Sequence, residues 1–345
     1  MNEHPTNLKP RNDTPSQASM KKFILLLCIA SLPILAHGAE NYQQCLTLAL
    51  QSADDSLTIG ELKQSCRQTS ANAEPTISQQ SAISRRQQSE KQTGWNAFSL
   101  MPHKPNYLIL SYNNSEPNSE PLDNAFPNHN ADLQHLETKF QLSMKFPVLQ
   151  NVIYGYGDLY AAYTNRSFWQ QFNKTHSSPF RETNHEAETW LSFNTNYSLA
   201  GFQGSIIRAG FSHQSNGRSG SLSRSWNRLY SEFIFEKEDL YLSFKPWYRI
   251  PENSSSDDNA DINHFMGHYE LRALYKHKQH TVDLMFRNNL KTGHNRGALE
   301  LAWSFPVHKN IRGYVQWFNG YGESLIDYNN HSNSIGFGVQ LSDWL

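Results

Sequence analysis

Three polar residues near the middle of the chain, His213, Ser215 and Asn227, have the side-chain types that acyl transfer requires. A serine hydroxyl is a weak nucleophile until a neighbouring base takes its proton, and a third group is needed to fix the ring orientation and tautomer of that base. Ser215, His213 and Asn227 supply these roles in that order. Because Asn is neutral, it would orient the imidazole well but stabilise the imidazolium less than an Asp would.

The spacing of these residues also has a purely structural interpretation. Ser, Asn and Gly are ordinary residues of hairpin tips, and one of the 15 histidines of the chain can fall beside them by chance. No G-x-S-x-G elbow marks Ser215 as a nucleophile. Spacing alone therefore leaves both interpretations open, and the elements that carry the residues have to be considered.

Both segments that carry the three residues alternate between apolar and polar positions. In 206–215 the period of two places His213 and Ser215 on the apolar face, together with Ile207, Ala209 and Phe211. Asn227 lies on the apolar face of the next segment, 225–237. A hairpin that turns near Gly220 would bring Asn227 opposite His213. The three side chains are thus predicted to meet on one apolar surface.

Similar alternation recurs through the second part of the chain and predicts an all-β fold. A soluble sandwich also alternates, but these segments run to roughly ten residues, the length of a tilted membrane strand. We therefore predict a transmembrane antiparallel β-barrel of about twelve strands over 95–345, in the bacterial outer membrane. The expected strands are 105–113, 134–147, 154–164, 185–197, 202–214, 225–237, 239–250, 263–275, 279–289, 296–306, 309–319 and 333–345.

Charge and composition suggest no nucleic-acid partner. The chain has 30 basic and 31 acidic residues, and aromatic residues make up 12% of it. Without a net positive charge, there is no electrostatic reason to expect nucleic-acid binding.

The N-terminal region has the pattern of an export signal. After Met20, two lysines precede an apolar run from Phe23 to about Ala36, and small residues follow. The run is too short for a comfortable transmembrane anchor, so we expect 1–38 to be an extension and signal peptide cleaved near Gly38. Met20 is a candidate for the true start.

The segment 39–94 is expected to be periplasmic and to precede the barrel. It contains Cys45 and Cys66, which could pair in an oxidising compartment, although two free thiols are the alternative. From Arg67 to Thr93 the chain is rich in Gln and Ser and has few apolar residues. Such a segment cannot bury enough surface to fold alone, so we expect a polar linker there.

Several long motifs resemble those of the bacterial outer membrane phospholipase A family. "FSHQSNGRSGSLSRSWNRLY" around Ser215 resembles its signature, and the resemblance extends from about Trp95 to Leu345. The other matching motifs are "SSPFRETNHE" from Ser177, "KPWY" from Lys245, "DDNADI" from Asp257 and "GYGESLIDYN" from Gly320.

This resemblance implies a calcium-dependent enzyme, activated by dimerisation, that hydrolyses acyl ester bonds of phospholipids and lysophospholipids. By position, Ser215 matches the nucleophile, His213 the base and Asn227 its orienting partner. Gly217 matches a donor to the oxyanion hole. The calcium ligands implied are the main-chain carbonyl of Arg218, Ser223, Ser177 from a neighbouring subunit, and Asp258 in the monomeric form.

The chain departs from the family pattern at two places. After "NGRS" it has Gly220 and Ser221, where the family commonly has Asp-Pro. The segment before "DDNADI", which reads "RIPENSSS", is longer than in the family. Outside the enzyme interpretation, the alternative is a non-enzymatic porin or adhesin, in which the stretch after His213 is only a surface loop.

Overall fold

The computed structural model describes residues 81–92, 99–126, 131–175, 177–255, 257–308 and 311–342, with the single positions Thr58, Gly60, Lys63, Gln64 and Cys66. The expected signal peptide and Cys45 lie outside the described residues. Cys66 is disulfide-bonded, and its pairing with Cys45 stays a prediction. Within the described ranges, no helix is long and apolar enough to cross a membrane.

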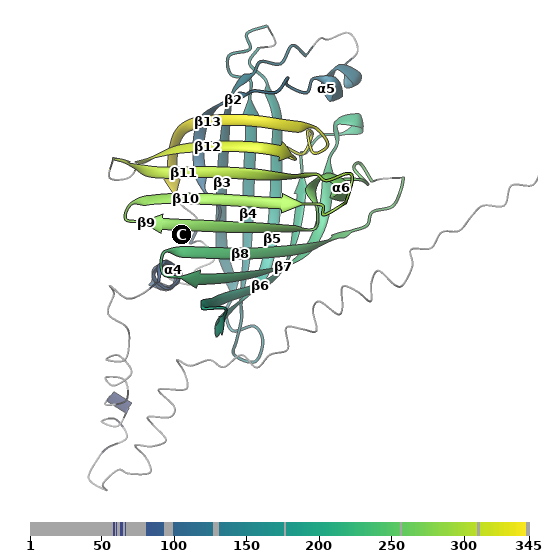
Figure 1. Cartoon of the computed structure of the whole chain (residues 1–345). Coiled ribbons are helices and arrows are strands. Elements are labelled where there is room, and N and C mark those ends of the chain that lie inside the picture. The colour runs from purple at the N-terminus through teal and green to yellow at the C-terminus, as the bar shows by residue number, and fades with distance from the viewer. Residues whose placement is uncertain are drawn as a thin grey trace, which may run out of the picture. The chain divides into compact units, whose positions relative to one another are not determined.

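Twelve antiparallel strands form a closed barrel, as predicted (Figure 1). Strands β2 to β13 each pair with their sequence neighbours, and β13 pairs with β2 to close the ring. A two-residue strand, β1 (Met101–Pro102), pairs with β3 beyond the end of β2. The barrel strands are β2 (Asn106–Asn113), β3 (Leu136–Leu149), β4 (Asp158–Trp169), β5 (Phe180–Leu199), β6 (Phe202–Ser215), β7 (Ser225–Lys237), β8 (Leu240–Ile250), β9 (Tyr269–His277), β10 (His280–Asn288), β11 (Gly297–His308), β12 (Ile311–Tyr321) and β13 (His331–Ser342).

The two faces of the strands separate as the alternation predicts. On β3, Leu142 is 49% exposed on the outer wall, whereas Lys139 and Gln141 are buried in the lumen. On β7, Leu229 is exposed and Arg228 is buried. Apolar side chains therefore face the lipid and polar ones fill the interior, the arrangement of an outer-membrane barrel.

The connections differ between the two ends of the barrel. At one end, here called the loop end, longer connections carry α5 (Glu120–Ala125), the short helix η2 (Gly220–Leu222) and α6 (Asn263–Met266). The opposite end, here called the turn end, has mostly shorter connections. Outer-membrane barrels have short periplasmic turns and long extracellular loops, so the loop end faces the outside.

Buried ion pairs fix the loop between β12 and β13 (322–330) to the lumen wall. Arg181 on β5 joins Glu137, at 2.9 Å, to Asp327, at 2.5 Å. Lys139 Nζ lies 2.9 Å from a carboxylate oxygen of Glu323. These buried ion pairs hold the β12–β13 loop in place at the loop end of the barrel.

A helix, α4 (Ala82–Gln92), occupies the region expected to be part of a polar linker. Ser81 caps the N-terminus of the helix, because its Oγ accepts a hydrogen bond from Ser84 N at 3.0 Å. Ala82 and Ile83 are buried in a cluster with residues of the barrel interior, Ile206, Ile234, Tyr241 and Leu274. The segment does not need to fold alone, because the barrel supplies the apolar surface that its own sequence lacks.

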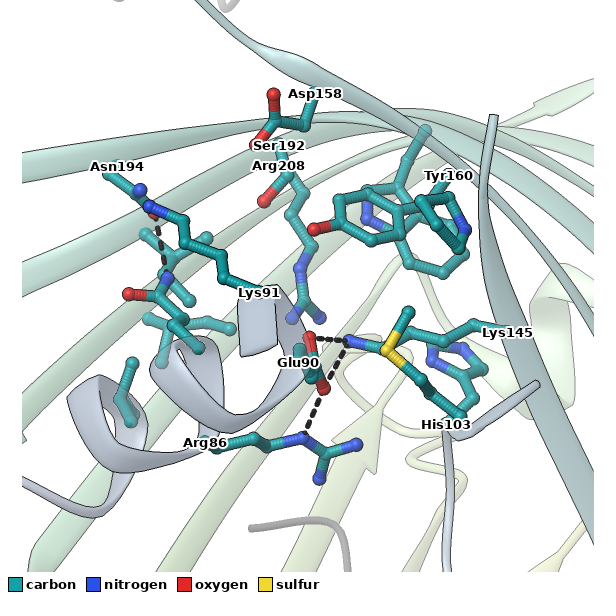
Figure 2. Close-up of a pocket in the computed structure, with 17 residues that line it drawn as sticks. Arg86, Glu90, Lys91, His103, Lys145, Asp158, Tyr160, Ser192, Asn194 and Arg208 are labelled. Atoms are coloured by element: carbon teal, nitrogen blue, oxygen red, sulfur yellow. Dashed lines mark hydrogen bonds and ion pairs between the residues drawn. The ribbon is translucent and has the colours of Figure 1, made fainter. Parts of the chain in front are cut away.

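The polar side of α4 is also paired with the barrel. Glu90 lies between Arg86, with an Nε to Oε1 distance of 2.7 Å, and Lys145 on β3, at 2.9 Å (Figure 2). Burial alone would raise the pKa of Glu90, but the charges of Lys145 and Arg86 lower it. The helix is thus held on the barrel by both apolar and ionic contacts.

Candidate active site

The site is built on the hairpin of β6 and β7, where His213 and Asn227 are register partners. His213 Nδ1 lies 2.9 Å from Asn227 Oδ1. Both side chains are half-buried and project on the outer face, because their neighbours Ser212 and Trp226 are fully buried in the interior. The structure therefore brings together the base and the orienting group that the sequence predicted.

Ser215 continues the outward row of His213 and is the last residue of β6. It is half-buried, and its register partners are His185 on β5 and Ser225 on β7. Among the described residues, the Ser215 hydroxyl has no hydrogen-bond partner, and none joins it to His213. Such contacts are often long in free enzymes and shorten when substrate binds.

The loop after Ser215 is shaped by Asn216, a residue that the sequence analysis missed. Its buried side chain donates to Leu222 O at 2.8 Å and accepts from Arg224 N at 3.0 Å. The next residue, Gly217, has φ of +65°, a conformation that favours glycine. A Cβ at this position would come no closer than 3.6 Å to His185, so backbone conformation and not space requires glycine there.

Two of the four expected calcium ligands are in contact. Ser223 Oγ donates to Asp258 Oδ2 at 2.6 Å, which joins the β6–β7 loop to the β8–β9 loop. The Arg218 guanidinium donates to Arg181 O at 2.6 Å. Ser177 is exposed on the β4–β5 loop, and no contact joins it to the other three within the described chain. Over those same residues, no group of three or more His, Cys, Asp or Glu side chains has a metal-binding arrangement.

The donor set at this loop has the chemistry that Ca²⁺ prefers. Ser223 and Asp258 offer a hydroxyl and a carboxylate oxygen, and the Arg218 carbonyl would add a third oxygen. Calcium takes hard oxygen ligands in flexible geometry and does not require a cluster of carboxylates in one chain. The residues present are therefore compatible with calcium.

Two further polar residues adjoin the site and were missed by sequence reasoning. Asn227 Nδ2 donates to Glu252 Oε1 at 3.2 Å. His185 lies opposite Ser215, with its Nδ1 2.5 Å from the Tyr163 hydroxyl. His185 has the same outward alternation as Ala187 and Thr189, so its face was predictable, whereas Glu252 lies in a loop without periodicity.

Three cavities of the barrel lie inside its wall, where inward side chains of β6 and β7 such as Arg208 and Arg228 line them. One lies beside α4 at the turn end (Figure 2), and two others are lined by the charged side chains of the lumen. None of these three is lined by His213, Ser215 or Asn227. The candidate active site is therefore part of the outer wall and not of an internal pocket.

The sequence of the chain is similar to those of known proteins. A family profile described as Phospholipase A1 matches residues 83–341. Phospholipase A1 of Salmonella typhimurium is 42% identical over 248 residues, which cover 72% of this chain and 83% of the relative. Phospholipase A1 of Escherichia coli K12 is 41% identical over 248 residues, which again cover 72% of this chain and 83% of the relative.

Among solved structures, the outer membrane phospholipase dimer of Salmonella typhi with bound calcium has a TM-score of 0.67 at 40% identity. The alignment covers 72% of this chain and 94% of that structure. The fold and these likenesses define an outer-membrane β-barrel enzyme. The chain belongs to the phospholipase A1 family, whose members are hydrolases that act on phospholipids. The alternative of a non-enzymatic porin or adhesin is set aside.

Proposed function

We propose that the chain is a calcium-dependent phospholipase of A1 and A2 type, with Ser215, His213 and Asn227 as its catalytic triad. The observation that carries this proposal is the 2.9 Å contact between His213 Nδ1 and Asn227 Oδ1 on the outer wall of the barrel. A base oriented through Nδ1 keeps Nε2 free for the proton of a nucleophile. Ser215 is the hydroxyl that lies on the same face of the same strand.

The reaction is an acyl transfer in two steps. Ser215 Oγ attacks the ester carbonyl carbon of the lipid while His213 Nε2 takes the hydroxyl proton. His213 then gives this proton to the departing glycerol oxygen, and an acyl-serine ester remains. In the second step His213 takes a proton from water, the hydroxide attacks the acyl-serine, and the proton returns to Ser215 as the fatty acid leaves.

The negative charge on the carbonyl oxygen needs donors that are already oriented. The Gly217 N–H is our candidate, because the left-handed conformation of Gly217 turns the backbone directly after the nucleophile strand. No protein acceptor for this N–H is found in the described part of the chain. It is therefore available to a substrate oxygen.

In the dimer, calcium would be held by Ser223 and the Arg218 carbonyl, with Ser177 of a second copy of the chain as a further ligand, and in the monomer Asp258 would serve as a ligand. When bound there, it would supply positive charge next to the reacting carbonyl. Support comes from the 2.6 Å contact of Ser223 with Asp258 and from the calcium-bound dimer of the Salmonella typhi relative. A site completed by a second chain would make activity depend on dimerisation.

A site on the outer wall suits a substrate that is a membrane lipid. The acyl chains stay in the apolar phase beside exposed residues such as Leu229, while the ester reaches the level of Ser215 near the loop end. No water-filled pocket is required.

The test is release of fatty acid from phospholipid and lysophospholipid in detergent micelles, with calcium or with chelator. We expect calcium-stimulated release by the wild type, and a loss of about a thousandfold or more in Ser215→Ala. Undiminished release by Ser215→Ala would refute the proposed nucleophile, whereas equal release with chelator would refute the calcium dependence alone.

A further inference from the structure

The amide of Asn227 has two partners, and only one of its two possible orientations suits both. Its Nδ2 donates to Glu252 Oε1 at 3.2 Å, and its Oδ1 faces His213 Nδ1 at 2.9 Å. An ionised carboxylate only accepts hydrogen bonds, so the NH₂ group has to face Glu252. In the reversed orientation, the amide oxygen would face the carboxylate and lose that hydrogen bond.

The strand register explains why Glu252 reaches this position. Ile250, the last residue of β8, is the register partner of Asn227 on β7. Glu252 follows two residues later, in the loop directly after β8, and its side chain reaches Asn227 from there. It lies within "RIPENSSS", the segment that is longer here than in the family pattern, and its side chain is half-buried.

We propose that Glu252 is a positioning residue for the triad, and this inference rests on the proposed function. By fixing the amide of Asn227, Glu252 ensures that an oxygen faces His213. His213 Nδ1 then has to carry the hydrogen, which leaves Nε2 unprotonated and able to accept the proton of Ser215. The chain of side chains therefore has four members, with Glu252 acting on the reaction only through Asn227.

Glu252 also adds negative charge, which the neutral amide of Asn227 lacks. A carboxylate that accepts from the NH₂ group polarises the amide and makes its oxygen a stronger acceptor. The imidazolium that forms when His213 takes the proton of Ser215 is then better stabilised. In this way a Ser-His-Asn site gains part of the electrostatic stabilisation that an Asp would provide.

The experiment is a double-mutant cycle on the full-length protein in micelles at saturating calcium. The variants are Glu252→Gln, Asn227→Ala and the double variant, and Glu252→Ala is a second probe of the same position. Glu116→Gln is the matched control, because its side chain is 93% exposed in another connection of the loop end. Thermal unfolding is followed in every variant.

We expect Glu252→Ala to lower kcat about tenfold, the loss of one hydrogen bond to a charged group, and Glu252→Gln, whose amide oxygen can still accept from Asn227, to lower it less, with KM unchanged in both. In the Asn227→Ala background, Glu252→Gln should cause no further loss, because a positioning residue has no effect once its target is gone. Glu116→Gln should match the wild type. A residue that only stabilised the loop would lower kcat by the same factor in both backgrounds.

Each other outcome has a definite meaning. If Asn227→Ala retains the wild-type kcat, the proposed triad fails, and the role of Glu252 with it. If Asn227→Ala loses activity but both Glu252 variants keep theirs, only the inference on Glu252 is overturned. Losses that multiply in the double variant also overturn it, because Glu252 would then act independently of Asn227.

Discussion

His213 and Asn227 lie directly opposite each other on β6 and β7, with 2.9 Å between Nδ1 of the imidazole and Oδ1 of the amide. The pair is fixed by the register of two hydrogen-bonded strands and not by a flexible loop. The orientation of the His213 ring is therefore a property of the barrel wall, and substitutions on either strand can test it.

Replacing Asn227 with Asp should lower activity, although Asp is the usual third member of such sites. The new carboxylate would lie beside Glu252, whose Oε1 is 3.2 Å from the present Nδ2. Like charges at this separation repel and favour protonation of one of them. We expect kcat of Asn227→Asp to fall about tenfold and to recover in Asn227→Asp/Glu252→Gln. Higher activity of Asn227→Asp alone would contradict this geometry.

Gly217→Ala should reduce kcat without a large loss of stability. Gly217 has φ of +65°, where an L-residue costs about 1 kcal/mol, so the chain would move the N–H away from the oxyanion position. We expect about a tenfold lower kcat at saturating calcium.

Gly220→Ala is the matched control for Gly217. Gly220 has φ of +63°, and a Cβ added there would meet nothing within 4 Å, so the backbone strain is the same. The thermal stability of Gly220→Ala should fall like that of Gly217→Ala while kcat stays near the wild-type value. Equal losses of kcat in both variants would show that loop strain, and not the Gly217 N–H, is responsible.

Substitutions of Asp258 and Ser177 should have different effects on calcium binding. Asp258→Asn should weaken calcium binding in the monomer, measured by calorimetry, by about tenfold because a charged ligand is lost. Ser177→Ala should leave monomer binding unchanged and weaken only the calcium-dependent dimer, measured by crosslinking. Asp239→Asn, in the β7–β8 turn at the other end of the barrel, is the control. Loss of monomer binding in Ser177→Ala would place Ser177 in a site of its own chain.

Glu323 should make the barrel sensitive to acid. Burial would raise its pKa, but the Lys139 charge and the hydroxyls of Ser334 and Ser332 together lower it to about 2 from 4.5. A carboxyl group with a lowered pKa stabilises the folded state above its unfolded-state pKa, and this contribution is lost as pH falls from about 4.5 towards 2.

We expect Glu323→Gln to lose about 3 kcal/mol at pH 7, because Lys139 is left buried without its partner. Its stability should then change less than that of the wild type between pH 4.5 and 2. Urea unfolding in micelles at several pH values measures both. Glu238→Gln, an exposed residue of the β7–β8 turn, should follow the wild-type curve.

The sequence predicted the barrel well because membrane strands have a strict period. Lipid on one side and a polar interior on the other force every second residue outward, so the face of His213 could be derived before the structure. The strand ends were harder to predict. The segment 263–275 was expected to be one strand, but it begins with α6, and β9 starts only at Tyr269.

The residues that escaped prediction depend on contacts between distant segments. Glu252 reaches Asn227 from a loop, where no period indicates a direction. Helix α4 buries Ile83 against residues such as Tyr241, 158 positions away, and its own polar sequence gives no sign of that partner. Local patterns predict the strand faces, because the membrane imposes their period. Such long-range contacts are found only in the folded chain.

Because His213 and Ser215 face outward, the relevant substrate concentration for this protein is the one within the surrounding lipid or detergent film. A site on the outer wall encounters only the molecules of the surrounding film, so encounters occur in two dimensions. The rate then follows the mole fraction of phospholipid in that film, and not its molarity in the sample. Inert detergent added at constant total phospholipid would slow the reaction by surface dilution, even though no inhibitor is present.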